Sequence, residues 1–395
     1  MRVLLVTNFA PHYRAPFFER LAEAIDIEYL FTSEGTESYW QPHVGTRPVA
    51  ARAQTIVGRS IGGGLTVNPR LVGELRRREY DVLIKCVNGR VELASAYAIA
   101  RARHKPFVFW ATMWWHPTTF SGWVYRPALQ AVYAGADAIV TDGEHICRYV
   151  AGHGVDAAKI FAAPIAVDND AYMRPIPPEQ REALRDELGA AQRPVVLAVS
   201  RLAAVKGLDV LVDAASRLAD LRPVVVIVGT GPLGRSLRQQ AQARGVDLKI
   251  VTGVPPEVMP VYYAAADVYA MPSVTTPEVR EVWGVGVNEA LCQRVPVVVS
   301  DAVGAAAAGL VVHRETGLVV PERDHYALAG ALRTLLEDRE PAARLAAAGQ
   351  ERVTSITYDA MVGSFKAAAE YAMAAHSGDA AAMVALRAVR FRPQR

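Results

Sequence analysis

Two carboxylates with glycines between them are the first residues whose types and spacing suggest chemistry. Glu281 and Glu289 stand in EVWGVGVNEALCQRVPVVVSD, with Gly284 and Gly286 between them. On one continuous helix, with steps of about 100° per residue, they would lie nearly on one face. The glycines instead favour EVWGVG as a loop and VNEALCQR as a short helix, with Glu289 near its start. One carboxylate would bind sugar hydroxyls and the other a ribose; a loop cap and a solvated helix residue are the plain alternative.

A pair of cations follows another predicted strand. Arg201 and Lys206 flank the loop of VSRLAAVKGLDVL, and a helical pattern begins near Leu208. A helix N-terminus binds phosphate through its dipole and free N–H groups, and fixed positive charges strengthen that binding. The stretch therefore suggests a phosphate site. On this stretch alone, a solvated arginine and lysine remain an alternative.

Three glycines after a third predicted strand formally match GxGxxG in VVVIVGTGPLG: Gly229, Gly231 and Gly234. A dinucleotide site also needs an acidic residue at the end of the next strand, where it binds the ribose. That strand, LKIVTG, ends in Thr252 and Gly253, and Asp247 precedes it. The sequence thus disfavours a dinucleotide site, and we interpret the glycines as a tight turn.

The elements that must position these residues alternate between β-branched runs and helical patterns. Runs such as RVLLVTN, YDVLIKC and KPFVFWA, and later VVLAVS, VVVIVG and VPVVVSD, are continuously apolar. Strands buried on both faces of a parallel sheet show this pattern, and helices form their crossovers. We predict an α/β protein with two doubly wound Rossmann-like domains facing each other across a cleft. Ligands should bind at the carboxyl ends of the strands.

Length and proline positions suggest the domain boundaries. A chain of 395 residues exceeds what one hydrophobic core usually serves. The alternation breaks at a proline-rich stretch, and prolines favour extended chain there. We predict an N-terminal Rossmann-like domain, a linker, a C-terminal Rossmann-like domain and a basic tail, over residues 1–170, 171–193, 194–354 and 377–395. A helix near 355–376 is expected to pack back on the N-terminal domain.

Composition narrows the function classes. The net charge of +3, from 43 basic and 40 acidic residues, argues against nucleic acid as a partner. The cysteines lack CxxC spacing, so they predict neither a disulfide framework nor a zinc site: Cys86, Cys147 and Cys292. These features fit a reducing cytoplasm. The sequence shows no signal peptide and no apolar run of about 18 residues, so we expect only peripheral membrane contact.

The motifs resemble, as a set, those of the retaining nucleotide-sugar glycosyltransferases of family 4, which have the GT-B fold. The matching stretches span about residues 196–320: SRLAAVKG, GTGP, VTGV followed by YYAAADVYAMPS, and EVWGVGVNEALCQRVPVVVSDAVG. A looser resemblance extends over most of the chain, including YDVLIK, ADAIVTDGEHICRYVAGHGVDAAKI and PIAVDNDAY.

The resemblance implies that residues 1–170 form the acceptor side and that residues 194–354 bind the nucleotide sugar. It also implies roles for individual residues. Arg201 and Lys206 would contact the diphosphate, Glu289 the ribose, and Glu281 the hydroxyls of the donor sugar. Backbone groups would complete the donor site, at Trp283, Gly284 and Val285 for sugar and phosphate, at the Gly231 turn, and at Thr252, Gly253 and Val254 for the base. No DxD-like acidic pair adjoins these motifs, so we expect neither a metal ion nor a separate cofactor.

Two stretches depart from the family pattern. Many relatives have a glycine pair after the first strand, where this chain has NFAPHYRAPFFERL. Many also place a histidine after the KPFVFW-type strand, near Thr112. His116 in WWHP is the candidate for that acceptor-side catalytic role, and a loop or packing histidine is the alternative.

Aromatic and basic clusters leave two further questions open. Five aromatic residues could stack on an acceptor sugar, touch lipid or pack in an interface: Trp110, Trp114, Trp115, Phe120 and Trp123. The tail AAMVALRAVRFRPQR contains four arginines and no acid: Arg387, Arg390, Arg392 and Arg395. Such a tail can lie on an anionic membrane, but a frayed terminus is favoured.

Together these features predict a cytoplasmic, metal-independent hexosyltransferase, peripheral on the inner membrane face. It would move a sugar, with retention, from a nucleoside-diphosphate sugar to a hydroxyl of a sugar, lipid-linked or small-molecule acceptor. Polysaccharide or glycoconjugate synthesis is the expected process. Glu281 would orient the donor, and a covalent glycosyl intermediate on it stays open. Another GT-B activity, such as a sugar-nucleotide epimerase, and a non-catalytic nucleotide-sugar-binding protein are the rival interpretations.

Overall fold

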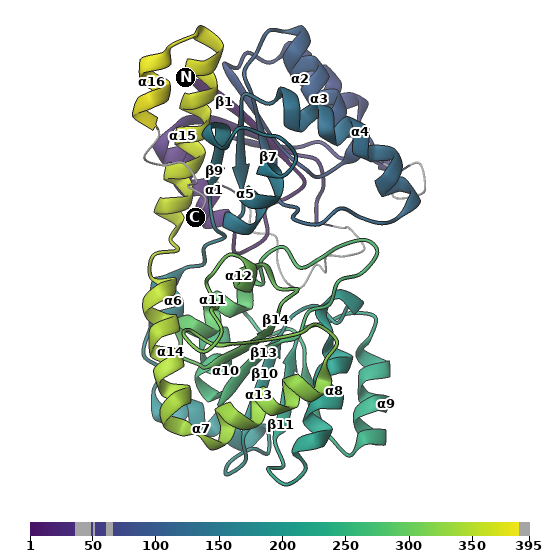
Figure 1. The fold of residues 1–395 in the computed structure, drawn as a ribbon, viewed down its shortest axis with the longest axis vertical. Helices are drawn as coiled ribbons and strands as arrows, with labels where there is room; N and C mark the ends of the chain where they lie inside the picture. The colour runs from purple at the N-terminus through teal and green to yellow at the C-terminus, as the bar shows by residue number, and fades with distance from the viewer. Residues whose placement is uncertain (36–48, 50–51, 61–65, 387–395) are drawn as a thin grey trace. The chain divides into compact units, whose positions relative to one another are not determined.

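The chain folds into two compact units, which are described separately. The computed structural model describes residues 1–35, 49, 52–60 and 66–386. The first unit comprises residues 1–165 and the chain from Tyr358 onward, and the second comprises Ala166–Thr357. Each unit is built on a parallel sheet with helices packed against it (Figure 1). The predicted pair of Rossmann-like domains is confirmed.

The first unit contains a seven-stranded parallel sheet in the order β3-β2-β1-β6-β7-β8-β9. Its strands are β1 (Arg2–Thr7), β2 (Asp26–Phe31), β3 (Ala53–Thr55), β6 (Val82–Cys86), β7 (Phe107–Ala111), β8 (Ala138–Thr141) and β9 (Ile160–Ala162). Every residue of β6, β7 and β8 is buried, as continuous apolar runs predict. Two short strands, β4 (Arg59–Ser60) and β5 (Thr66–Val67), form a separate antiparallel pair.

Helices cover both faces of this sheet. Figure 1 shows α2 (Pro69–Arg77), α3 (Arg90–Ala102) and α4 (Phe120–Gly135) together on one side, with α1 (Ala15–Ala24) and α15 (Tyr358–Ser377) on the other. The unit also contains α5 (Glu144–Ala151) and α16 (Ala380–Ala385). Phe365 of α15 packs its ring 4.9 Å from those of Phe17 and Trp110. The helix expected near 355–376 is thus α15, and it belongs to the first unit.

The second unit contains a six-stranded parallel sheet in the order β12-β11-β10-β13-β14-β15. Its strands are β10 (Val195–Val199), β11 (Val224–Val228), β12 (Asp247–Val251), β13 (Val268–Met271), β14 (Val297–Ser300) and β15 (Leu318–Val320). The strand order reverses between β10 and β13. Parallel sheets bind ligands at such a switch point, outside the carboxyl ends of the strands.

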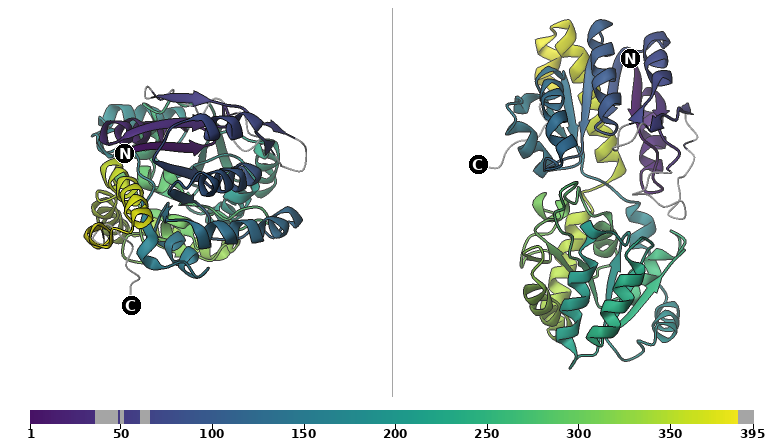
Figure 2. Two further views of the ribbon diagram at one scale, coloured as in Figure 1. Left: turned by 90° about the horizontal axis from the view of Figure 1, so that it is seen from above. Right: turned by 90° about the vertical axis from the view of Figure 1, so that its right-hand side faces the viewer.

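Two groups of helices enclose the second sheet, and Figure 2 shows its strands lying between them. One group consists of α8 (Leu208–Ala215), α9 (Gly234–Arg244) and α13 (His325–Glu337). These helices pack with the strands in an apolar core to which Ala342 and Leu345 also belong. The other group consists of α6 (Asn169–Met173), α7 (Pro178–Glu187), α10 (Met259–Ala265), α11 (Val285–Cys292) and α14 (Arg339–Val353). A short helix, α12 (Gly304–Ala307), follows β14.

The segment 171–193, predicted as a linker, differs from that prediction because it is part of the second unit. Proline occupies the first turn of α7, where its missing N–H costs nothing, so this proline starts a helix rather than interrupting one. Arg185 of α7 donates to the carbonyl oxygen of Ala265 at 2.8 Å and to Asp267 at 3.0 Å. These bonds fix α7 against the unit.

Two expectations concern membrane contact. Among the helices in the described ranges, none has the length and apolar character needed to cross a bilayer. The four arginines of the tail lie outside the described residues, so the membrane role predicted for them stays a prediction.

Candidate active site

The carboxyl edge of the second sheet collects the predicted donor-side residues. Because all six strands are parallel, the loops that follow β12, β11, β10 and β13 emerge side by side at this edge. These loops contain residues 252–254, 229–231, 201–206 and 272–284. The fold therefore places together four stretches that are far apart in the sequence.

Lys206 and Glu281 form the central contact of this edge. Lys206 Nζ donates to Oε2 of Glu281 at 2.5 Å, and the two side chains are only 12% and 13% exposed. Ser273 Oγ donates to the same oxygen at 3.4 Å. The two residues predicted to bind phosphate and sugar thus form one ion pair, which the sequence does not reveal.

A glycine makes this contact possible. Lys206 ends the short 3-10 helix Ala204–Lys206, and the next residue, Gly207, has a φ of 58°. A Cβ at Gly207 would lie 2.0 Å from the carbonyl oxygen of Pro272. Only glycine allows the loop after β10 to approach the loop after β13 so closely.

The pair retains binding capacity for a ligand. A lysine ammonium carries three N–H donors, and the contact with Glu281 occupies one of them. Two donors can still bind phosphate oxygens. Glu281 accepts from Lys206 and from Ser273 through Oε2, and each of the two oxygens of a carboxylate can accept hydrogen bonds. The geometry is therefore compatible with both predicted roles at once, and each role stays a prediction.

Helix α11 begins beside the pair. Its N-cap, Gly284, has a φ of 97°, and a Cβ there would lie 2.5 Å from Met271 Sδ. The helix starts at Val285, two residues before the predicted VNEALCQR, so Gly286 lies within it and not in a loop. Free N–H groups at such a helix start attract anions.

Trp283, just before this helix, is buried and does not offer its ring to a ligand. Its indole Nε1 donates to Asn288 Oδ1 at 2.8 Å, and its side chain belongs to the core. Its carbonyl oxygen accepts from Ala305 N at 2.8 Å. The predicted backbone contact of Trp283, Gly284 and Val285 with the donor stays a prediction.

Glu289 lies one turn into α11 and is buried. Tyr263 donates its hydroxyl hydrogen to Oε2 of Glu289 at 2.5 Å. Burial raises the pKa of Glu289 by disfavouring the charged form, and hydrogen bonds from Tyr263 and Tyr172 oppose that rise. The sequence carries no motif that assigns a role to either tyrosine.

The glycine turn after β11 packs against the Arg201 loop. Cβ atoms at Gly229 and Gly231 would lie 2.0 Å and 2.4 Å from the carbonyl oxygens of Ser200 and Leu202. Leu202 N donates to the carbonyl oxygen of Thr230 at 2.8 Å. The glycines therefore serve close loop packing, which agrees with the predicted tight turn.

The predicted base-binding residues lie after β12. Thr252 and Gly253 are exposed and Val254 is half-buried, and Gly253 has a φ of 72°. Asp247 begins β12 at the opposite, amino end, where it pairs with Arg193 at 2.7 Å. Asp247 therefore does not lie where a dinucleotide site needs its acidic residue, as the sequence predicted.

His116 lies in the first unit, between β7 and α4. Its Nε2 is 3.0 Å from the carbonyl oxygen of Gly122. Because a carbonyl only accepts, this contact requires the hydrogen on Nε2. The bond ties the loop to the first turn of α4, as in the packing alternative, and neither His116 nor Thr112 gains a catalytic role from it.

The first unit contains a buried ion pair that the sequence analysis did not predict. Arg14, in the loop after β1, donates to Asp142 Oδ2 at 2.9 Å, and Trp110 Nε1 donates to Oδ1 at 2.8 Å. Burial raises the pKa of Asp142, while both donors oppose this rise. The polar stretch TDGEH, at the end of a predicted strand, was the feature of the sequence that could have indicated Asp142.

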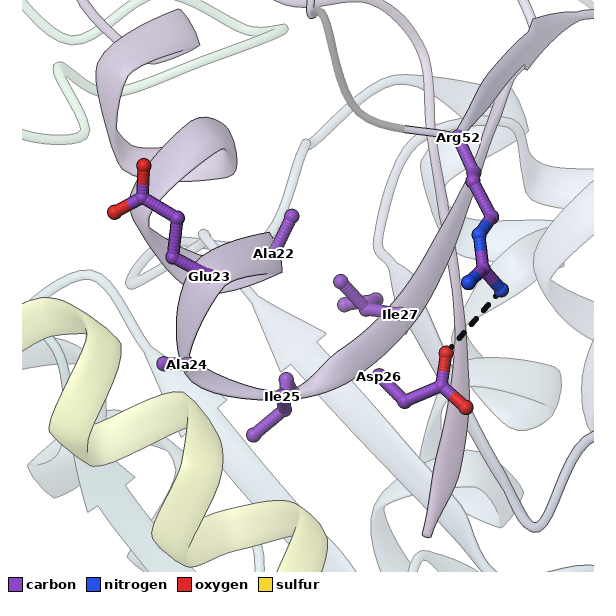
Figure 3. A pocket seen from close by; sticks show the side chains of 7 residues that line it. All are labelled: Ala22, Glu23, Ala24, Ile25, Asp26, Ile27 and Arg52. Atoms are coloured by element: carbon purple, nitrogen blue, oxygen red, sulfur yellow. Dashed lines mark hydrogen bonds and ion pairs between the residues drawn. The ribbon is translucent and has the colours of Figure 1, made fainter.

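A hollow of the first unit lies away from the carboxyl ends of the strands. It is found at the turn from α1 to β2, where Arg52 pairs with Asp26 at 3.3 Å (Figure 3). Its lining residues are Ala22, Glu23, Ala24, Ile25, Asp26, Ile27 and Arg52. Asp26 begins β2, so the hollow is at the amino edge of the sheet. It holds none of the predicted site residues.

Comparison with known proteins identifies the family. The family model described as "Glycosyl transferases group 1" matches residues 180–352. A GDP-mannose-dependent alpha-(1-6)-phosphatidylinositol monomannoside mannosyltransferase of Mycobacterium tuberculosis is 34% identical over 378 residues, covering 90% of this chain and 94% of that enzyme. This chain belongs to the group 1, or family 4, glycosyltransferases.

Further known proteins match this chain over shorter stretches or in fold alone. A D-inositol 3-phosphate glycosyltransferase of Jonesia denitrificans is 33% identical over 221 residues, covering 52% of this chain and 50% of that protein. The structure of Anabaena Alr3699/HepE with UDP superposes with a TM-score of 0.75 at 21% identity, over 93% of this chain and 98% of that one. WaaG, a lipopolysaccharide glycosyltransferase, superposes with a TM-score of 0.65 at 17% identity, over 93% and 98%. These structures establish the GT-B fold.

Proposed function

We propose that this glycosyltransferase moves a hexose, with retention at the anomeric carbon, from a nucleoside-diphosphate sugar to an acceptor hydroxyl. The observation that carries the proposal is the ion pair of Lys206 and Glu281 at the carboxyl edge of the second sheet. The pair places an ammonium and a carboxylate together near the start of α11, and we propose that the ammonium binds phosphate and the carboxylate binds sugar hydroxyls. A donor that joins a diphosphate to a sugar presents both complementary groups at once.

The chemistry needs positive charge at the leaving group. As the glycosidic bond breaks, negative charge accumulates on the diphosphate, and preorganised donors stabilise it. Arg201, Lys206 and the N–H groups at the α11 N-terminus would supply those donors. Glu281 would hold the sugar hydroxyls and, through its contact with Lys206, keep the ammonium in place. We propose that no metal ion is needed for this step.

The names of relatives guide the choice of substrates. The Mycobacterium tuberculosis relative is named for GDP-mannose and a phosphatidylinositol monomannoside acceptor. The HepE structure contains UDP. We propose a glycolipid or polysaccharide acceptor for this chain, with GDP-mannose as the first donor to test and UDP-glucose as the second.

A turnover assay tests the proposal. Each donor is incubated with and without lipid-linked and simple sugar acceptors, and release of nucleoside diphosphate is measured. Acceptor-dependent release that is lost in Glu281→Ala is expected. Acceptor-independent conversion of the donor would favour an epimerase. Tight donor binding without any turnover would favour a non-catalytic binding protein.

An exposed aromatic face of α4 suggests where a membrane contact would form. Phe120, Trp123 and Val124 are 81%, 70% and 56% exposed. The neighbouring Arg126 is also exposed, and α4 contains no acidic residue. Aromatic rings favour the membrane interface, and a nearby cation favours anionic lipid. We propose that this face touches an anionic bilayer on its cytoplasmic side and brings the enzyme to a lipid-linked acceptor.

A further inference from the structure

Three tyrosines from three separate elements surround the carboxylate of Glu289. Tyr172 belongs to α6, Tyr263 to α10 and Tyr269 to β13. Their rings form a continuous row, with centroids 6.1 Å apart between Tyr172 and Tyr263, and 5.8 Å apart between Tyr263 and Tyr269. We call these residues the tyrosine cluster. All three are buried, so their hydroxyl groups face the protein interior.

The cluster packs directly on the first turns of α11. A Cβ at Gly286 would lie 2.3 Å from the hydroxyl oxygen of Tyr269 and 3.2 Å from that of Tyr263. Gln293, at the other end of the helix, donates to the carbonyl oxygens of Tyr172 and Arg174. Helix α11 is thus held at both ends against the elements that carry the tyrosines. A small shift of the Tyr263 hydroxyl would therefore change its hydrogen bond to Glu289.

The hydrogen bonds hold Glu289 in one orientation and stabilise its charged form. Tyr263 donates to Oε2 at 2.5 Å, and the neighbouring Tyr172 hydroxyl also lowers the pKa of this carboxyl group. Burial raises the pKa of Tyr263 well above its ordinary value, so its hydroxyl remains a donor at neutral pH. Without these donors, burial of the carboxylate would go uncompensated, and the group would take up a proton.

The Glu289 carboxylate has hydrogen-bond acceptor sites that a ligand could use. An ionised carboxylate has about four acceptor sites. The Tyr263 hydroxyl occupies one of them at Oε2, so acceptor sites remain beside it for a ligand. A ribose presents two neighbouring hydroxyl groups, so the remaining capacity matches a vicinal diol. A protonated Glu289 would instead present a donor of its own and lose part of this match.

We propose that Tyr263, assisted by Tyr172, is a positioning residue that holds the Glu289 carboxylate ready to accept the two ribose hydroxyls of the donor. This inference rests on the proposed function, because it assumes that Glu289 binds the nucleotide. It goes further by assigning the state of that carboxylate to two tyrosines. Neither tyrosine needs to touch the substrate.

Other titratable and charged groups lie near Glu289, and the experiment must separate their effects from those of Glu289. Burial, with the nearby charges of Glu289 and Asp168, raises the pKa of Cys292 to about 12, so this thiol stays neutral across the assay range. Glu281 acts on Tyr269, whose pKa is well above its ordinary value, chiefly because of burial. A variant that removes the charge at residue 289 shows which part of the pH dependence comes from Glu289.

The experiment measures binding of GDP and of UDP by calorimetry between about pH 5 and about pH 9. The variants are Tyr263→Phe, Tyr172→Phe and Glu289→Gln. Tyr262→Phe is the matched control, because Tyr262 is the adjacent residue of α10 and is also buried, but its hydroxyl does not bond Glu289. Melting temperatures establish that each variant is folded.

The expected result is a shift in the pH profile. Losing the Tyr263 hydrogen bond raises the pKa of Glu289 further, so the loss of affinity at low pH should begin at higher pH in Tyr263→Phe. Affinity should fall on the order of tenfold at neutral pH and recover in part at about pH 8.5. Tyr172→Phe should shift the profile in the same direction. Tyr262→Phe should match the wild type, and Glu289→Gln should bind weakly with no acid limb from this group.

Two other results would overturn different statements. If Glu289→Gln binds both nucleotides as the wild type does, the ribose role of Glu289 is wrong. If Glu289→Gln binds weakly while Tyr263→Phe keeps the wild-type profile, the ribose role stands and the positioning role of Tyr263 is wrong. A pH-independent loss in Tyr263→Phe would also contradict it, because simple loosening of the fold does not move a titration.

Discussion

The ammonium of Lys206 and the carboxylate of Glu281 lie 2.5 Å apart, although 75 positions separate the two residues in the sequence. The pair joins the loop after β10 to the loop after β13. If Lys206 binds the diphosphate and Glu281 the sugar, neither residue can be changed without disturbing the other. The functions of the two residues are therefore coupled.

Coupling predicts non-additive effects in a double-mutant cycle. Lys206→Ala and Glu281→Ala should each lower turnover, and the double variant should be about as slow as the slower single variant. A matched control is the exposed pair of Arg333 and Asp220, 2.7 Å apart in the same unit. Alanine at either control position should leave turnover unchanged. Losses that simply multiply in the double variant would mean that Lys206 and Glu281 act independently.

Glu289 provides a prediction about stability and pH. Burial raises its pKa in the folded state. Between the ordinary pKa and the raised one, the folded protein binds more protons than the unfolded chain, so stability falls as pH rises through the folded pKa. Glu289→Gln carries no such charge.

The melting temperature of Glu289→Gln should therefore gain on that of the wild type as pH increases from about 5 to about 8. Thermal melts in matched buffers measure the difference. If the melting temperature of the wild type instead rises relative to that of Glu289→Gln over this pH range, the predicted direction is wrong. The expected gain contrasts with the expected loss of nucleotide binding, because the buried charge serves function at the expense of stability.

Sequence patterns predicted the strands well because parallel strands buried on both faces are continuously apolar. β11, for example, is VVVIV and entirely buried. Sequence patterns were misleading for residues whose effect depends on where they stand in a helix. Pro178 looks like a breaker in a pattern, but it starts α7 because the first turn needs no N–H there. Gly286 looks like a loop residue, but it lies in α11, where the Tyr269 hydroxyl takes the space of a side chain.

The candidate site was predictable only in part for a similar reason. Residue types and loop positions pointed to Arg201, Lys206, Glu281 and Glu289. Contacts between distant residues, such as Tyr263 with Glu289, leave no periodic trace in a sequence. The tyrosines stand in the quoted stretches PIAVDNDAY and YYAAADVYAMPS, which resemble the family without indicating a partner.

Positive charge at the diphosphate predicts independence from metal ions. Arg201→Ala and Lys206→Ala should each reduce kcat by at least about 10²-fold, as the loss of one preorganised donor commonly does. Exhaustive EDTA treatment should leave wild-type activity unchanged. Loss of activity with EDTA and its restoration by magnesium or manganese would contradict this prediction. Acidic residues such as Asp301, whose Oδ1 accepts from Glu322 N at 2.9 Å, would then need testing as ligands.

The aromatic face of α4 predicts binding to anionic membranes. Trp123→Ser and Phe120→Ser should reduce co-sedimentation with vesicles containing anionic lipid, and turnover of a soluble acceptor should be unchanged. Tyr326→Ser is the matched control, because Tyr326 is an aromatic residue of the second unit that is 64% exposed. Equal sedimentation of all variants would contradict a membrane role for α4. Loss of sedimentation on deletion of residues 381–395 alone would assign the contact to the basic tail.

The anomeric configuration of the product shows whether the enzyme transfers the sugar with retention. Proton NMR follows the first turnovers of the donor that the acceptor screen selects, with the acceptor present and EDTA in the buffer. A retaining transferase should form a glycoside with the same anomeric configuration as the donor, only when acceptor is present, and Glu281→Ala should form no such product. An inverted glycoside, or an altered sugar nucleotide formed without acceptor, would contradict a retaining glycosyl transfer.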